Sequence, residues 1–193
     1  MRNVVFLDLD ETLTTTFPLV EMDNLDAQIE SARLQLSTAQ TPAATIFRRK
    51  MMEIYRNRKA QIPDCKPLNR SLGVLKRPGV DEAIIALSSV ADVHLFTAAD
   101  MNYAREVLAI TKTRIPGELF TTRDEMQLPD VSKNAWVLVD DLLSGEKVKM
   151  LGETDVEKYC YQVKPLDYGA NNTPMTDYVE DVCRRLMARQ MGK

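Results

Sequence analysis

Short apolar segments alternate with amphipathic segments along most of the chain, and this alternation constrains the fold more than any other feature. The apolar segments are NVVFLDLD, ADVHLFTAAD, GELFTTRD, AWVLVDD and KYCYQV. The first, second and fourth are nearly continuous runs, as expected of strands that are buried on both faces. Strands separated by helices predict βαβ units, and therefore an α/β fold with a mainly parallel sheet flanked by helices.

Helical periodicity fills the intervals between these runs. Apolar residues recur at helical spacing over residues 79–90 and 100–112, and residues 175–190 are predicted to form a closing helix. Residues 17–71 break the alternation, because two consecutive amphipathic helices are predicted there, over 22–40 and 41–62. We therefore expect a core of residues 1–16 and 72–193, with residues 17–71 inserted after the first strand as a small helical cap.

The composition favours an ordinary intracellular protein. The 193 residues are 45% hydrophobic and 27% charged, with a net charge of −3 that does not itself favour nucleic-acid or membrane binding. Cys65, Cys160 and Cys183 are widely spaced, which indicates free thiols in a reducing compartment. No apolar run approaches the roughly 18 residues that a membrane span needs. The sequence thus predicts a cytoplasmic protein without a membrane partner.

Carboxylates and one hydroxyl follow three of the predicted strands. Asp8 and Asp10 end the first strand, Thr97 ends the second, and Asp140 and Asp141 end the fourth. In a parallel sheet, ligands bind beyond the carboxyl ends of the strands, so these groups are expected at one edge. Crowded carboxylates repel one another unless a cation neutralises them. Oxygen-only ligands suit Mg²⁺, which is the predicted cofactor.

This set of groups fits phosphoryl chemistry. A carboxylate fixed near Mg²⁺ can attack phosphorus and form an aspartyl-phosphate. Asp10 lies two residues after Asp8, and it can protonate the leaving group and later deprotonate water. A hydroxyl such as that of Thr97, together with a cation, can bind the transferring phosphoryl oxygens.

The same residues resemble a known family. VVFLDLDETLT resembles motif I of the haloacid dehalogenase (HAD) superfamily, VHLFTAAD resembles motif II, and WVLVDD resembles motif IV. LKRPGVDEAI is similar to a segment of the branch that contains the C-terminal-domain and NLI-interacting-factor-like phosphatases, and the C-terminal pattern of strand, loop and closing helix also follows that branch. The resemblance covers about residues 1–16 and 72–193, and it implies a HAD-like fold and phosphatase activity.

By that resemblance, Asp8 is the nucleophile and Asp10 is the general acid and base. Thr12 would support the motif I loop, Thr97 would hold the phosphoryl group, and the adjacent Ala98 would contribute to substrate binding. The presence of Asp10 favours phosphatase chemistry over dehalogenase chemistry.

The resemblance also implies a Mg²⁺ site. The Asp8 side chain, the Asp10 backbone carbonyl and the Asp140 side chain would ligate the metal, and Asp141 would be an auxiliary ligand or a hydrogen-bond acceptor beside it. The family also requires a catalytic cation between motifs II and IV. Lys133 is preferred for this role although it stands unusually close to Asp140, and Arg123 remains the alternative at a more usual distance.

The insert departs from the small β-insert of the C-terminal-domain phosphatases. Residues 48–59 carry six basic residues and one acidic residue, a local charge of +5. The helix is either a solvated face or a basic lid that attracts a phosphorylated substrate, in which case Arg48 and Arg49 would bind that substrate.

The sequence therefore predicts a Mg²⁺-dependent phosphomonoester hydrolase. Candidate substrates are a nucleotide, a polynucleotide end, a small metabolite or a phosphoprotein. The alternative is a non-catalytic binding module on a HAD core.

Overall fold

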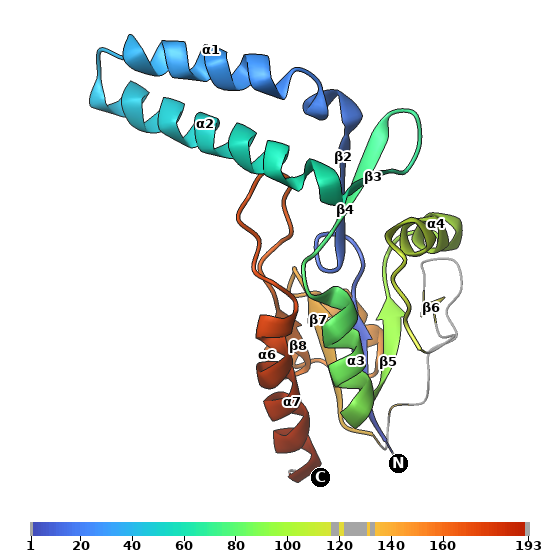
Figure 1. Ribbon diagram of the computed structural model, residues 1–193. Helices are drawn as coiled ribbons and strands as arrows, with labels where there is room; N and C mark the ends of the chain where they lie inside the picture. Colours follow the sequence, from blue (N-terminus) through green and yellow to red (C-terminus); the bar gives the residue numbers. More distant parts are fainter. Residues whose placement is uncertain (1, 117–119, 122–130, 132–133, 192–193) are drawn as a thin grey trace. The chain divides into compact units, whose positions relative to one another are not determined.

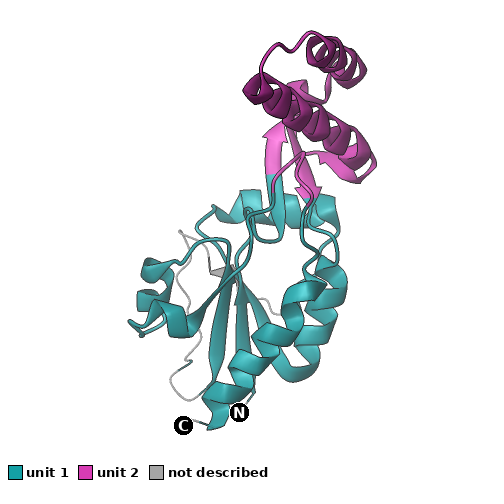
Figure 2. Cartoon of the chain, turned by 90° about the vertical axis from the view of Figure 1, so that its left-hand side faces the viewer, with its two compact units in different colours: residues 1–15, 76–166, 172–193 teal, residues 16–75, 167–171 magenta. Residues whose placement is uncertain are grey.

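The computed structural model describes residues 2–116, 120–121, 131 and 134–191 (Figure 1). The chain divides into two compact units, coloured separately in Figure 2. The first unit comprises residues 1–15, 76–166 and 172–193, and the second comprises residues 16–75 and 167–171. Residues 167–171 thus join a unit that is otherwise built from the N-terminal part of the chain.

The first unit is built on a five-stranded sheet in which every neighbouring pair is parallel. The strand order is β6-β5-β1-β7-β8. The bounds are Asn3–Leu7 for β1, Ala91–Phe96 for β5, Phe120–Thr121 for β6, Trp136–Asp140 for β7 and Cys160–Gln162 for β8. The predicted parallel α/β sheet is confirmed, and all five apolar runs supply a strand.

Helices lie on both sides of this sheet (Figure 2). They are α3 (Val80–Val90), α4 (Met101–Thr111), α5 (Gly145–Met150), α6 (Val156–Tyr159) and α7 (Thr176–Met191). Helices α3 and α7 contact each other, α3 also contacts β5, and α7 also contacts β7. The three helices expected from periodicity are therefore present, with ends within a residue or two of those expected.

The central strands form the core because their side chains are apolar on both faces. Val5, Phe6 and Leu7 of β1 are fully buried, as are the side chains at the centre of β7. The Phe6 ring packs edge-on against Phe96 of β5 and Trp136 of β7, with ring centroids 5.7 and 6.0 Å apart. A sheet that is buried on both faces holds the ends of its strands rigidly, so the polar residues that directly follow the strands are also held in fixed positions.

The second unit contains two helices and a three-stranded sheet. Helix α1 spans Leu25–Ser37 and α2 spans Pro42–Gln61, with the short 3-10 helices η1 (Leu19–Met22) and η2 (Ile62–Asp64) beside them. The sheet has the order β2-β4-β3, with bounds Thr14–Pro18 for β2, Cys65–Pro67 for β3 and Leu72–Lys76 for β4.

The two helices of the insert were predicted, but its sheet was not. The strands are too short and too polar for alternation to reveal them, since β2 reads TTTFP and β3 reads CKP. The Phe17 ring of β2 stacks on Tyr168 at 3.9 Å, which joins residues 167–171 to this unit. That contact is set by packing and has no counterpart in local sequence.

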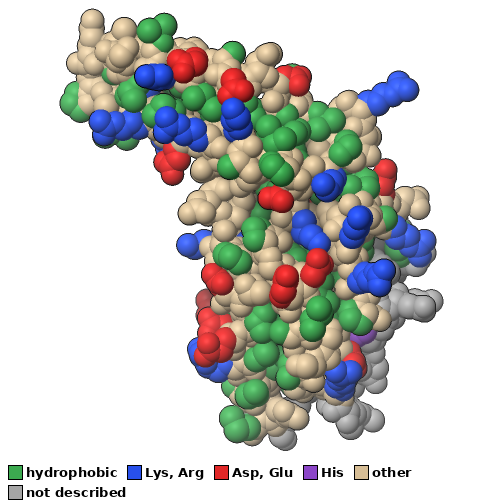
Figure 3. All heavy atoms as spheres, viewed as in Figure 1, with side chains coloured by type: hydrophobic (Ala, Val, Ile, Leu, Met, Phe, Trp, Pro, Cys, Tyr) green, Lys and Arg blue, Asp and Glu red, His purple; other side chains and the backbone are tan. Residues whose placement is uncertain are grey.

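Helix α2 is unusual because none of its twenty residues is buried. It begins at Pro42, where the Thr41 hydroxyl accepts a hydrogen bond from the Ala44 N–H at 3.2 Å. Ile46 and Phe47 are 68% and 64% exposed. Lys and Arg side chains are visible along the α1–α2 hairpin in Figure 3. The helix is therefore held mainly by contacts with α1 rather than by a core of its own.

Two further expectations concern cysteines and membranes. Cys65, Cys160 and Cys183 are all free, as predicted. Within the described residues, no helix has the length and apolar character needed to cross a bilayer.

Candidate active site

The register of the parallel strands brings the predicted site residues to one edge of the sheet. Leu7 of β1 pairs with Leu95 of β5 and with Val139 of β7, so the residues after these positions lie at the same level. The Asp8 N–H donates to the Val139 carbonyl at 2.9 Å, which continues the ladder one step past β1. Asp8 is thereby level with Asp140, and the next residues of each strand extend beyond the sheet edge.

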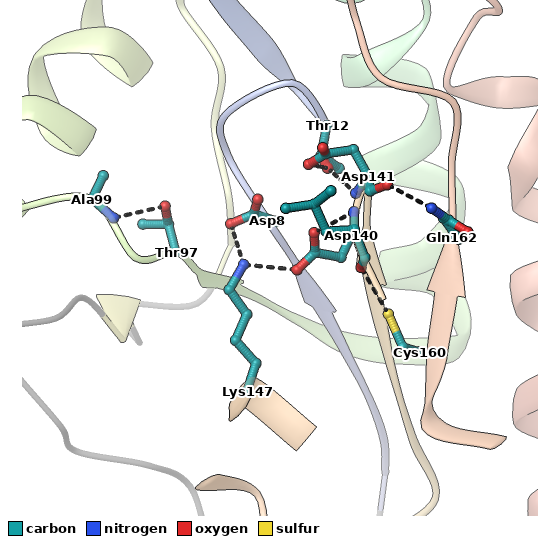
Figure 4. Close-up of polar contacts among 10 residues, drawn as sticks. Asp8, Thr12, Thr97, Ala99, Asp140, Asp141, Lys147, Cys160 and Gln162 are labelled. Carbon is teal, nitrogen blue, oxygen red and sulfur yellow. Dashed lines mark hydrogen bonds and ion pairs between the residues drawn. The ribbon is translucent and has the colours of Figure 1, made fainter. Parts of the chain in front are cut away.

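Three buried carboxylates meet at this edge (Figure 4). Asp8, Asp140 and Asp141 each offer an oxygen, and these oxygens lie within 4.8 Å of one another. Their exposed fractions are 7%, 1% and 5%. Three acidic groups at this spacing and depth repel one another strongly unless cations compensate for them.

Lys147 supplies one such cation. It lies in α5, and its Nζ is 2.7 Å from Asp8 Oδ1 and 2.8 Å from Asp140 Oδ2, as Figure 4 shows. Burial opposes its charged form, but the carboxylates of Asp8 and Asp140 outweigh that effect and raise the pKa of Lys147. Lys147 is therefore a fixed positive charge in direct contact with the predicted nucleophile.

One ammonium does not balance the cluster. Burial, followed by the charge of Asp140, raises the pKa of Asp8 from 3.8 to about 7, even though Lys147 acts in the opposite direction. Burial and the charge of Asp140 also raise the pKa of Asp141. Both carboxyls thus hold their protons to a higher pH than they would in water, and a further cation would favour their ionised forms.

Thr12 forms hydrogen bonds with Asp141 of the cluster. Its hydroxyl accepts a hydrogen bond from the Asp141 N–H at 2.8 Å and lies 3.3 Å from Asp141 Oδ1. Gln162 of β8 donates to the Asp141 carbonyl at 3.0 Å, and the Leu142 N–H donates to Asp140 Oδ1 at 2.9 Å. These bonds fix the segment after β7, whereas the expected support of the motif I loop by Thr12 stays a prediction.

Asp10 occupies a separate position. Its Oδ1 accepts a hydrogen bond from the Tyr103 hydroxyl of α4 at 2.7 Å. Burial raises the pKa of Asp10, while the bond from Tyr103 and then the charge of Lys147 act to lower it. A carboxyl with a raised pKa beside a carboxylate cluster suits a group that must carry a proton and release it.

A buried arginine fixes the loop that carries Asp10 and Thr12. Arg77 is 1% exposed, and its guanidinium donates to four backbone carbonyls. These carbonyls belong to Glu11, Thr12, Lys164 and Thr173. Glu11 has a φ of 58°, a left-handed conformation that costs energy for a residue other than glycine. Arg77 therefore holds the loop after β1 in a strained shape by bonding two of its carbonyls.

The remaining predicted residues fall into three groups. Thr97 is buried at the end of β5, and its hydroxyl accepts from the Ala99 N–H at 3.2 Å, whereas Ala98 is exposed. Lys133 and Arg123 lie outside the described residues. Arg48 and Arg49 belong to the second unit, where the Arg48 guanidinium donates to the Gln35 carbonyl of α1.

Two residues of the site escaped the sequence reasoning. Lys147 was missed because the catalytic cation was sought only between Thr97 and Asp140, whereas Lys147 follows the Asp140-Asp141 pair. Tyr103 escaped notice because it falls on the apolar stripe of the helix predicted over residues 100–112. One clue was available, because Asp100 is a good N-cap and fixes where the first turn of α4 begins.

The donor set of the cluster fits a hard divalent cation. All three side chains are carboxylates, which suit Mg²⁺ rather than a soft metal, and the pKa of Asp8 is raised first by burial and then by the charge of Asp140, so a bound cation would favour its ionised form. The Asp10 side chain is not one of the three carboxylates of this cluster. The Asp10 backbone carbonyl therefore stays a predicted ligand of Mg²⁺.

Comparisons with known proteins identify the family of the chain. The sequence profile of the NLI interacting factor-like phosphatases matches residues 3–142. No curated protein matches the chain. Among solved structures, one of Fcp1, named as an essential RNA polymerase II CTD phosphatase, is 17% identical with a TM-score of 0.49 and is matched over 100% of this chain and 50% of that chain. Fission yeast Fcp1 bound to beryllium fluoride is 15% identical with a TM-score of 0.49, over 100% and 52%.

The chain thus spans about half the length of the Fcp1 chains. A Thermotoga maritima protein assigned as a β-phosphoglucomutase is 14% identical with a TM-score of 0.50, over 94% of this chain and 99% of that one, and it shares the HAD-like fold. The profile match covers well over half of the 193 residues and runs from the first strand through the Asp140-Asp141 pair. On this match, the chain belongs to the NLI interacting factor-like phosphatase family, a branch of the HAD-type phosphatases.

Proposed function

We propose that this chain is a Mg²⁺-dependent phosphomonoester hydrolase that works through an aspartyl-phosphate on Asp8. The observation that carries the proposal is the contact of the Lys147 ammonium with Asp8 Oδ1 at 2.7 Å inside a buried carboxylate cluster. A carboxylate attacks phosphorus only when it is ionised and oriented, and an ammonium at hydrogen-bond distance favours both conditions.

Asp8 begins the reaction as the nucleophile. Its free oxygen forms a bond to phosphorus as the bond between phosphorus and the leaving oxygen breaks. Asp10 gives its proton to that leaving oxygen. In the second half, water attacks the phosphorus, Asp10 accepts the water proton, and the bond to Asp8 breaks to release inorganic phosphate. The same carboxyl therefore serves as acid and then as base.

Charge on the transferring phosphoryl oxygens has to be stabilised throughout. Lys147 offers N–H donors beside the nucleophile, and Thr97 offers a hydroxyl at the end of β5. We assign Lys147 the part of the catalytic cation, which frees Lys133 and Arg123 from that requirement. Mg²⁺, held by oxygens of Asp8, Asp140 and Asp141, would supply additional positive charge for phosphoryl transfer.

The class of phosphate monoester stays a prediction, with nucleotides, polynucleotide ends, metabolites and phosphoproteins as candidates. A cytoplasmic location is likewise a prediction, based on the free thiols. The intact constellation of Asp8, Asp10 and Lys147 argues against a binding module that lacks catalysis, because such a module has no need to bury three carboxylates with an ammonium that pairs with two of them.

The test is turnover of a generic aryl phosphate. The purified chain should hydrolyse it with Mg²⁺ present, lose activity in excess EDTA and regain it with added Mg²⁺. Asp8→Asn should reduce kcat by at least about three orders of magnitude with the fold retained, because no other described group is placed to attack. The exposed Asp177 of α7 offers a matched Asp177→Asn control. Retention of more than about a tenth of wild-type kcat by Asp8→Asn, a loss of under ~1.4 kcal/mol in transition-state stabilisation, would exclude the covalent mechanism.

A further inference from the structure

We propose that Tyr103 is a positioning residue that orients Asp10 for proton delivery, and that it thereby determines how well the enzyme cleaves esters with poor leaving groups. This inference rests on the proposed function, since it requires Asp10 to act as the general acid. It adds to that function a residue from α4, outside the strand ends that carry the carboxylates, and a consequence for the range of alcohols that the enzyme releases.

The contact is direct and well defined. The Tyr103 hydroxyl donates to Asp10 Oδ1 at 2.7 Å, and both side chains are half-buried. The position of the phenol follows from the start of α4. Asp100 is the N-cap, and its Oδ1 accepts a hydrogen bond from the Tyr103 N–H at 2.9 Å. The chain from Thr97 to Tyr103 therefore positions two hydroxyl groups. The Thr97 hydroxyl lies at the end of β5, and the Tyr103 hydroxyl, from the first turn of α4, bonds to Asp10.

The hydrogen bond gives the two carboxyl oxygens of Asp10 different roles. The bond from Tyr103 occupies Oδ1 as an acceptor, so the acidic proton of Asp10 is carried by Oδ2. Rotation about the last bond of an aspartate side chain is only weakly restricted by its own energetics, so an unanchored carboxyl would sample many orientations. Tyr103 selects one, and Arg77 holds the backbone beneath it through the carbonyls of Glu11 and Thr12.

The need for this proton depends on the leaving group. As the bond between phosphorus and the leaving oxygen breaks, negative charge develops on that oxygen, and the Asp10 proton neutralises it. A nitrophenolate bears the charge well and leaves without help, whereas a phenolate needs help and an alkoxide needs it most. Misorientation of Asp10 should therefore slow alkyl and phenyl esters while sparing nitrophenyl esters.

The experiment is a leaving-group series with Tyr103→Phe. The wild-type and variant chains, both with Mg²⁺, are assayed on 4-nitrophenyl phosphate, phenyl phosphate and an alkyl phosphate, and kcat/KM is compared. This parameter reports the steps through the first phosphoryl transfer, so the later action of Asp10 on water does not affect it. We expect a loss of about tenfold or more for the alkyl ester, a smaller loss for phenyl, and a change within about twofold for nitrophenyl, because general acid catalysis contributes roughly 10²–10⁴-fold in all.

The controls separate positioning from a structural effect. Tyr161 of β8 donates to Asp181 Oδ2 at 3.1 Å, so Tyr161→Phe removes the same kind of bond elsewhere in the first unit and should leave the series flat. The ratio between two substrates measured on one sample does not depend on the folded fraction. In an Asp10→Asn background, Tyr103→Phe should cost nothing further for the alkyl ester, since the two residues act through one proton.

The outcomes are distinct. A loss by Tyr103→Phe that is equal for all three esters, or no loss for the alkyl ester, would overturn the role of Tyr103 while the proposed hydrolase stands. An additive loss in the Asp10→Asn background would also overturn it. If the wild-type chain hydrolyses none of the esters, the proposed function fails instead.

Discussion

Replacement of the nucleophile Asp8 by asparagine should stabilise the metal-free protein, and the gain should grow with pH. Burial and the charge of Asp140 raise the pKa of Asp8 from 3.8 to about 7. Below pH 3.8 the carboxyl is protonated in both the folded and the unfolded chain and changes stability little. As the pH rises toward 7, the unfolded chain has lost the proton while the folded chain retains it, so the free energy of unfolding falls.

The size of the effect follows from the same interval. At roughly 1.36 kcal/mol per pKa unit, the difference between 3.8 and about 7 amounts to about 4 kcal/mol once the pH exceeds both values. About 2 to 3 kcal/mol of this cost should develop between about pH 5 and pH 8. The side-chain amide of the Asp8→Asn variant has no charge to bury, so the variant escapes the cost and keeps the pair between Lys147 and Asp140.

Urea unfolding in EDTA at about pH 5 and pH 8 measures the effect. The advantage of Asp8→Asn over wild type should grow by about 2 to 3 kcal/mol between these pH values, whereas that of the exposed control Asp177→Asn should stay constant. Added Mg²⁺ should stabilise the wild type at the higher pH more than the variant, because a cation bound to the cluster compensates for its charge. An advantage that is constant or that shrinks with pH would show that Lys147 already compensates for the burial of Asp8, and the reasoning would be wrong.

Two further predictions concern cations in the two units of the chain. Lys147→Ala should lower kcat for an aryl phosphate by about 100-fold or more in steady-state assays. Lys147→Arg should restore little of this activity, because a planar guanidinium cannot replace a compact ammonium between two carboxylates. If Lys147→Ala keeps wild-type turnover, Lys133 or Arg123 supplies the catalytic cation instead. On α2, three basic residues changed together to Gln should lower kcat/KM more for multiply phosphorylated substrates than for an aryl phosphate. The effect should fade as the Debye length drops from ~10 Å at 0.1 M salt to ~3 Å at 1 M. A loss of kcat/KM that is equal for all substrates and independent of salt would contradict this prediction. The triple variant changes Arg49, Lys50 and Arg56 and spares Arg58, which pairs with Glu21 at 2.8 Å.

Much of the core fold follows from local sequence. The apolar runs of β1, β5 and β7 can only be buried on both faces, and helical segments between them lead to a parallel sheet. Parallel strands end at a common edge, so the approach of Asp8 to Asp140 was foreseeable from pattern alone. The family resemblance rested on the same residues, and the profile match over residues 3–142 confirms it.

Packing decided what local pattern could not express. The sheet of the second unit escaped notice because its short strands leave no periodic trace, and its link to residues 167–171 depends on the stack of Phe17 on Tyr168. Such contacts join segments that are distant in sequence, and many alternative partners are equally compatible with the pattern.

The catalytic details divide in the same way. The chain's order of residues determined which acids end which strands, because a strand end is a local property. It did not determine that the ammonium of Lys147 lies between Asp8 and Asp140, or that the Tyr103 hydroxyl reaches Asp10. The sequence alone does not indicate whether a long side chain on a helix surface contacts a neighbouring residue or solvent. Only the packing of α4 and α5 in the folded unit selects these partners, since it partly buries the Tyr103 and Lys147 side chains and brings them within hydrogen-bond distance of the carboxylates.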